Sequence, residues 1–165
     1  MNHSKKIVST SLIFFILITL AGCIRPPIRS IHNINGLFLP SRSYREPSLA
    51  NRWLASLVNN NGKDKIELID LRGRARIPIA AINRADSQPI SVAISANGNV
   101  IVFIRQRDDQ TELFIYRRLV GTVQKIDLTP KGIPRRVALN FDGKVLAVQV
   151  SREGRWDIDI IRLKI

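Results

Sequence analysis

The chain has 165 residues and a formal net charge of +13, from 26 Lys and Arg against 13 Asp and Glu. Hydrophobic residues make up 45% and charged residues 24%, which excludes a disordered tail, a collagen-like fibre and a multi-span membrane protein. The single Cys excludes a disulfide framework and a Cys-based zinc cluster, and two His leave little for metal or acid-base chemistry. One folded domain is expected.

The amino terminus has the pattern of an export signal. Lys5 and Lys6 precede an apolar run over residues 7–20, which is shorter than the roughly 20 residues that a membrane span requires. The run ends at Leu20-Ala21-Gly22-Cys23, which resembles the lipobox of bacterial lipoproteins. The resemblance implies that Cys23 carries diacylglycerol and becomes the first residue of the mature chain. An ordinary secretory signal or an uncleaved anchor is the alternative, and either would still export the chain.

The predicted organisation is therefore a lipoprotein signal peptide over 1–22, a lipidated amino terminus and tether over 23–45, and repeats over 46–165. We expect a bacterial lipoprotein held on the periplasmic or extracytoplasmic face of a membrane. Ile24 stands where some Gram-negative lipoproteins carry an Asp that retains them in the inner membrane. This favours the outer membrane only in a host that sorts lipoproteins in that way.

Three copies of one unit follow the tether. The segment from Ser95 recurs 45 residues later from Asn140, and a third copy starts 47 residues upstream at Ser48. The copies span about 46–89, 90–134 and 135–165. Short Val- and Ile-rich runs between turn residues predict strands, which in the middle copy lie near 90–95, 100–106, 112–117 and 122–128. The second of these is apolar at every position, as in a central strand, and the more polar fourth suits a sheet edge.

The turns of the repeats contain Asn-Gly or Asp-Gly. At Asn61-Gly62, Asn97-Gly98 and Asp142-Gly143 these pairs predict two-residue hairpins of the primed type, which require positive φ. Asn51 replaces the glycine in the first copy, and Asn is the residue other than Gly that best tolerates the left-handed region. We expect the turn to be kept there.

At this level the repeat resembles the blade of TolB-like β-propellers. The resemblance is carried by Phe141-Asp142-Gly143-Lys144 and Arg155-Trp156-Asp157-Ile158, and it covers the chain from Pro47 to Leu163. It implies an all-β fold of three four-stranded antiparallel propeller-type blades, a partial propeller. The last copy stops after its third strand. Asn97 and Asn51 depart from the family pattern of Asp-Gly, which weakens any transfer of ligand-binding residues.

Three blades cannot close a ring, because propellers have four to eight. Two blade faces are therefore expected to be unpaired. Leu37-Phe38-Leu39 in the tether either packs locally or completes the third blade, in cis or from a partner chain. Two chains could also pair as half-rings in a homodimer.

No motif of catalysis stands out, and we predict no catalytic residue, no metal and no cofactor. His32 lies in the tether, outside every repeat, where a catalytic base would lack a rigid surround. Asp142, Asp157 and Asp159 are expected to be turn formers and solvated strand residues. A propeller-based hydrolase is the less favoured class. Trp53 and Trp156 are predicted to pack between blades.

Arginine dominates the basic excess. Arg72, Arg74 and Arg76 alternate along the expected outer strand of the first blade and would share one face, where they could bind an anion. A solvated basic surface is the equal alternative. A nucleic-acid partner is not expected of an exported chain. We therefore predict a binding or scaffold module contacting envelope proteins, with a receptor for an anionic envelope polymer or lipid headgroups as the alternative.

Overall fold

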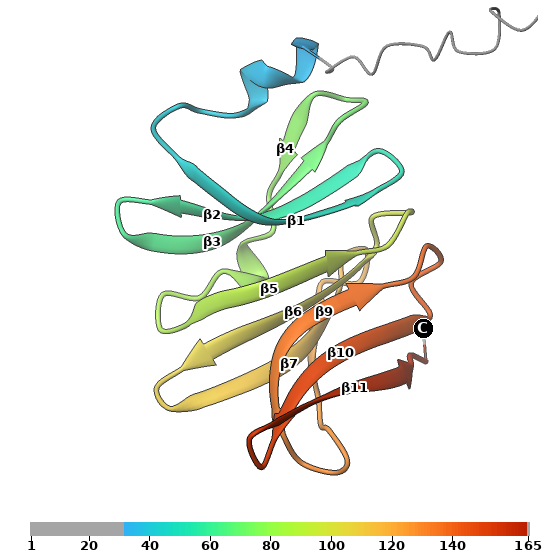
Figure 1. The fold of residues 1–165 in the computed structure, drawn as a ribbon. Coiled ribbons are helices and arrows are strands. Elements are labelled where there is room, and N and C mark those ends of the chain that lie inside the picture. Colours follow the sequence, from blue (N-terminus) through green and yellow to red (C-terminus); the bar gives the residue numbers. More distant parts are fainter. Residues whose placement is uncertain (1–31, 165) are drawn as a thin grey trace, which may run out of the picture. The chain divides into compact units, whose positions relative to one another are not determined.

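The computed structural model describes residues 32–164. Within them, the strands form three antiparallel sheets that follow one another in chain order (Figure 1). Sheet I contains β1 (Ser43–Ala50), β2 (Trp53–Asn60), β3 (Lys63–Asp70) and β4 (Ala75–Ile77). Sheet II contains β5 (Gln88–Ile94), β6 (Val100–Arg107), β7 (Gln110–Arg117) and β8 (Thr122–Ile126). Sheet III contains β9 (Ile133–Leu139), β10 (Val145–Arg152) and β11 (Arg155–Arg162).

The first strands of the sheets, β1, β5 and β9, lie side by side. A short 3-10 helix, η2 (His32–Leu37), precedes sheet I, and η3 (Ala80–Ile82) links sheets I and II. The all-β prediction is confirmed. The third sheet has three strands among the described residues, in the order β11-β10-β9, so the expectation of three four-stranded sheets holds only for the first two.

Two apolar layers hold the sheets together. Leu57 and Leu68 of sheet I pack against Ile101 and Phe103 of sheet II. The opposite face of sheet II packs on sheet III in the same way, through the residues Val102, Ile104, Leu113, Ile115, Leu146, Val148 and Val150. Sheet II is therefore covered on both faces, which is why β6 is apolar over Val100–Ile104. The predicted central position of β6 and the edge position of β8 are confirmed.

The predicted hairpin turns are right at one place and wrong at two. Asn61 and Gly62 both have positive φ (54° and 80°) between β2 and β3, as a primed two-residue turn requires. The Gly98 and Gly143 turns are longer. In the first, Gly98 N–H donates to the Ser95 carbonyl, and the Ser95 hydroxyl accepts from the N–H of Val100 (3.1 Å). Because the Ser95 side chain supplies the hydrogen-bond acceptor for this backbone N–H, only Gly98 needs positive φ (70°).

The turn of the first copy is shorter than the Gly98 turn, but the left-handed conformation is kept at Asn51. This residue has φ 55°, in the left-handed region, and Ala50 pairs with Trp53 across the turn. The substitution of Asn for Gly is therefore accommodated as predicted.

Candidate functional site

One face of sheet III is left without a neighbouring sheet among the described residues. Val148 and Val150 of β10 point toward sheet II, so the alternate residues point away from it. We call this surface the open face. It consists of Arg136, Ala138, Val145, Ala147, Gln149, Ser151, Trp156, Ile158, Ile160 and Arg162. None of these residues is acidic, and the large apolar ones lie in β11.

The repeat shows how unusual this exposure is. Ile158 and Ile160 stand 45 residues after Leu113 and Ile115, at the same positions of the next sheet. Leu113 and Ile115 are 1% and 2% exposed because sheet III covers them, whereas Ile158 and Ile160 are 63% and 67% exposed. The open face therefore has the composition of a buried sheet face at its β11 strand, without a covering layer.

The acidic residues of β11 lie on its other face. Asp157 and Asp159 both approach the guanidinium of Arg152, at 3.5 and 2.5 Å. The hydrogen bond from Arg152 holds the pKa of Asp159 below its usual range. Arg152 also donates to the Pro130 carbonyl (2.8 Å), which ties β10 to the loop before β9. Both carboxylates thus pair with Arg152, and Asp159 is not the solvated strand residue that the sequence predicted.

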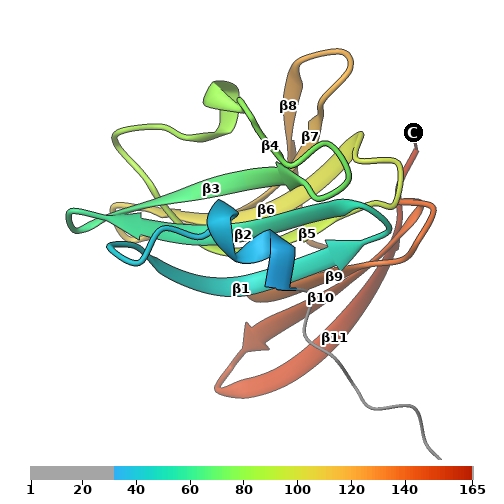
Figure 2. The ribbon, with the colours of Figure 1, turned by 90° about the horizontal axis from the view of Figure 1, so that it is seen from above.

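The opposite end of the three sheets is partly covered. The Arg76 guanidinium donates to the Leu37 carbonyl, and the Leu39 N–H donates to the Tyr44 hydroxyl (3.0 Å). Phe38 meets the Tyr44 ring edge to face at 5.1 Å. Glu67 accepts from both Arg76 (2.9 Å) and Arg42 (3.3 Å). We call residues 37–42 the cap. Figure 2 shows η2, which leads into the cap, lying over sheet I.

The position of the cap corrects two expectations. Leu37-Phe38-Leu39 packs on sheet I and does not complete sheet III of its own chain, because its hydrogen bonds go to β1 and β4. The three sheets also do not present two equivalent unpaired faces. Ser56, Val58 and Ile69, on the face of sheet I that points away from sheet II, are buried. The open face of sheet III is thus the less covered of the two ends, although Leu49 on the outer face of sheet I is also exposed.

The predicted arginine triplet is divided between a turn and a strand. β4 begins at Ala75, so Arg76 alone lies in it, paired with Glu67. Arg72 and Arg74 lie in the preceding turn, which Asp70 closes by accepting from the backbone N–H of Arg72 and of Gly73 (both 3.0 Å). The expected common strand face is therefore wrong. Anion binding by Arg72, Arg74 and Arg76 stays a prediction.

The two tryptophans have different environments. Trp53 is buried against Gly98 of sheet II, and the guanidinium groups of Arg52 and Arg118 lie 4.7 and 4.9 Å from the centre of its ring. Its predicted packing role is confirmed. Trp156 lies exposed on the open face, so the same prediction is wrong for it. Cys23, the predicted lipid attachment site, lies outside the described residues, and His32 begins η2.

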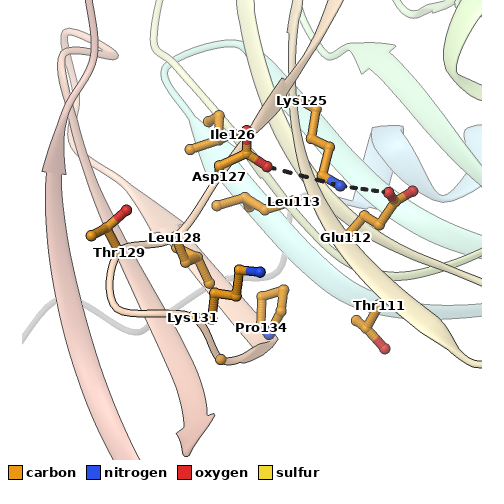
Figure 3. Close-up of a pocket in the computed structure, with 11 residues that line it drawn as sticks. Thr111, Glu112, Leu113, Lys125, Ile126, Asp127, Leu128, Thr129, Lys131 and Pro134 are labelled. Atoms are coloured by element: carbon orange, nitrogen blue, oxygen red, sulfur yellow. Dashed lines mark hydrogen bonds and ion pairs between the residues drawn. The ribbon is translucent and has the colours of Figure 1, made fainter.

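A cavity of about 460 Å³ lies between sheet II and the loop that leads to β9. Figure 3 shows the side chains that line it. Lys125 lies between Glu112 (2.9 Å) and Asp127 (3.8 Å), and its hydrogen bond lowers the pKa of Glu112. The charges around Lys125 are thus satisfied within the cavity, which makes it a weaker candidate than the open face. No group of three or more metal-ligating side chains occurs in residues 32–164.

Hydrogen bonds of polar side chains join β1, β5 and β9, the first strands of the three sheets. Glu46 has positive φ (49°) at an irregularity of β1 and accepts from Ser91 (3.3 Å) and from Arg136 (3.0 Å). The Ser91 hydroxyl in turn accepts from the Val137 N–H (3.3 Å). Arg136 is therefore anchored to β1 at the inner border of the open face.

Sequence reasoning expected unpaired faces but did not single out Ile158 and Ile160. The signal was available in the repeat, because both residues align with apolar positions of the middle copy. The alignment does not show that Leu113 and Ile115 are buried by the next sheet, and only the structure gives this information.

Comparison with protein-family models finds no match, and comparison with curated protein sequences finds none. Among solved structures, the chain is similar to that described as "Crystal structure of TolB from Acinetobacter baumannii", with a TM-score of 0.55 and 21% sequence identity. The similarity covers 71% of this chain and 29% of that one, so the matched part is less than a third of TolB. The fold is thus TolB-like, which confirms the resemblance at the level of architecture.

Proposed function

We propose that the chain is a membrane-anchored binding module of the bacterial cell envelope, which holds another envelope protein on the open face and is not an enzyme. The observation that carries the proposal is the exposure of Ile158 and Ile160 where the preceding repeat buries Leu113 and Ile115. Contiguous exposed apolar surface of this kind commonly marks a protein contact. The TolB-like fold is compatible with such a role.

The size of the open face suggests the kind of contact. Three strands of about eight residues, about 4.8 Å apart and rising about 3.3 Å per residue, cover roughly 400 Å². A stable interface buries about 800 Å² on each partner. The face alone therefore suits a transient contact, and a stable complex requires a further element.

The proposed anchor is Cys23. It rests on Leu20-Ala21-Gly22-Cys23 at the end of the apolar run and on the basic residues before that run. Two or three acyl chains would hold the module on a membrane surface, since each buried methylene contributes about 0.8 kcal/mol. Replacing Cys23 by Ser should abolish fatty-acid labelling and release the chain from the membrane fraction.

Charge favours a second candidate, a receptor for an anionic polymer or lipid headgroups. Arg72 and Arg74 are exposed in one turn of a chain with net charge +13. Replacing both by Ala, with Arg76 kept for its bond to the cap, should weaken salt-sensitive binding to anionic vesicles. A half-ring homodimer stays a prediction, and it would require the cap to leave sheet I.

The main proposal is tested by photo-crosslinking in membranes of cells that express the full chain. A benzophenone amino acid is placed at Ile158 or, as a control, at Leu119, which is 75% exposed in the turn between β7 and β8. We expect a discrete protein adduct at position 158 that is lost when Ile160 is replaced by Lys, and no such adduct at 119. Equal adduct patterns at both positions would contradict a specific interaction surface.

A further inference from the structure

Sheets I and II show what can lie beside β11. In each of them the third strand pairs with a short fourth strand, β4 on β3 and β8 on β7. In sheet III the third strand is β11, and no described residue pairs with its far edge. The internal repeat thus supplies a template for the occupant of this position.

The backbone of β11 is arranged for that pairing. Leu163 N–H donates to the Lys144 carbonyl (2.8 Å), and this pair continues the register of Val145 with Arg162. Because bonded and non-bonded pairs alternate along antiparallel strands, Ile158, Ile160 and Arg162 direct their N–H and C=O groups away from β10. An exposed row of such groups is a ready template for another strand.

The equivalent groups of β7 are used in this way. Arg118 N–H donates to the Asn99 carbonyl (2.8 Å), which by the same alternation directs Leu113, Ile115 and Arg117 toward β8. They pair there with Ile126, Gln124 and Thr122. In sheet II, the outward-directed backbone groups of the third strand, β7, are therefore paired with a fourth strand, β8.

We propose that the protein partner supplies an extended strand that pairs antiparallel with Ile158–Arg162 and completes sheet III. This proposal rests on the proposed function, since it names how the same partner is held. Strand addition gains main-chain hydrogen bonds for affinity and side-chain pockets for specificity. It also supplies the additional contact that the small open face lacks.

The template defines the chemistry of the incoming strand. Ile126 lies opposite Leu113, the equivalent of Ile158, and packs into the apolar layer between sheets II and III. The residue opposite Ile158 should therefore be apolar.

A second position is specified by an arginine. Arg117 donates to the side-chain oxygen of Gln124 (3.1 Å), which lies opposite Ile115. Arg162 is the equivalent of Arg117, 45 residues later. Sheet I has Asp70 in place of this arginine and the apolar Ile77 opposite Leu68, so sheet II is the template at this position. The residue opposite Ile160 should thus be a hydrogen-bond acceptor such as Gln, Glu or Asp, two residues before the apolar one.

The experiment supplies a fourth strand to sheet III in cis. Ile165 stands 45 residues after Val120, so appending Gly-Thr-Val-Gln-Lys-Ile to it reproduces the spacing of residues 121–126. The matched control appends Gly-Thr-Val-Pro-Lys-Pro. Its prolines replace two of the three residues whose N–H groups would face β11, and proline cannot donate to a ladder. Amide hydrogen exchange is measured in the purified chains, and crosslinking from position 158 is measured in membranes.

We expect the appended strand to slow exchange of the Ile158 and Ile160 amides at least about tenfold and to abolish the partner adduct, while the proline control does neither. Amide protection with an unchanged adduct would mean that the partner binds the open face without pairing with the edge of β11. This result would contradict the proposed strand addition and leave the proposed function intact. If the appended strand does not protect these amides, the proposal that the edge of β11 accepts a further strand is wrong. An adduct formed only with a second copy of this chain would mean that the position beside β11 serves self-association. It would contradict the proposal that a different protein supplies the strand.

Discussion

Leu113 and Ile158 occupy the same position in successive sheets, yet one side chain is 1% exposed and the other 63%. Both lie in the third strand of their sheet and point toward the place of the next sheet. Sheet III fills that place for Leu113, and no described residue fills it for Ile158. The difference between the two residues therefore lies in their neighbours and not in their own strands.

The stability of the isolated chain should reflect this difference. Leu113→Ala should lower the free energy of unfolding by about 2–5 kcal/mol, because it leaves a cavity between sheets II and III. Ile158→Ala should cost less than about 1 kcal/mol, since its side chain is already largely in water. Urea denaturation measures both. Equal losses would mean that Ile158 is covered in the isolated chain.

Gly98 and Gly121 provide a second matched pair. Both have positive φ, 70° and 74°, so alanine at either place should lower the free energy of unfolding by about 1 kcal/mol through its backbone conformation. At Gly98 the new Cβ would also lie 2.4 Å from Trp53, whereas nothing lies within 4 Å at Gly121. Gly98→Ala should therefore cost about 1–3 kcal/mol more than Gly121→Ala in urea denaturation. A similar cost for the two variants would show that Trp53 is not tightly packed.

Removal of residues 35–40 tests the role of the cap. The deletion takes away residues 37–40 of the cap, with their hydrogen bonds to Tyr44 and Arg76, so the midpoint of urea denaturation should fall. It also creates a second uncovered sheet face, on which the open face of another copy could pack head to tail. Sedimentation velocity should then show association that increases with concentration, and adding Ile158→Lys should suppress it. A stable, monomeric deletion variant would contradict the covering role of the cap.

Acid should weaken sheet III through Asp159. Its pKa is lowered by Arg152, so its stabilising effect is complete above the unfolded value of about 3.9 and is lost as pH falls through the lower folded value. Asp159→Asn should lower the melting temperature at pH 7 and show a smaller further drop between pH 5 and 2. The exposed Asp127→Asn serves as control and should follow the unmodified chain. Parallel curves for Asp159→Asn and the unmodified chain would exclude this carboxylate as a source of acid sensitivity.

The strands were predictable because their signals are local. The apolar run of β6 and the turn residues around it place a central strand without reference to any neighbour, and the structure agrees to within a few residues. Asn51 was likewise predictable, since its left-handed φ follows from the alignment with Gly98.

The site was less predictable because it depends on neighbours distant in sequence. Alternation placed Arg72, Arg74 and Arg76 on one strand, but β4 is too short to include the first two. Leu37 could have packed on either end of the repeats, and its bond to Arg76 is a tertiary contact that no local pattern encodes. Ile158 looks like a core residue in sequence, and its exposure depends on whether another sheet follows.

Thiol labelling at position 158 is the most direct measurement of whether the open face is covered in the membrane. Ile158→Cys is labelled with a water-soluble maleimide in native membranes and again after extraction, with Leu119→Cys as the exposed control. At about 90% occupancy by a partner, labelling of position 158 should be about tenfold slower in membranes than after extraction, while position 119 reacts equally in both. Equal rates at position 158 in the two preparations would contradict the account.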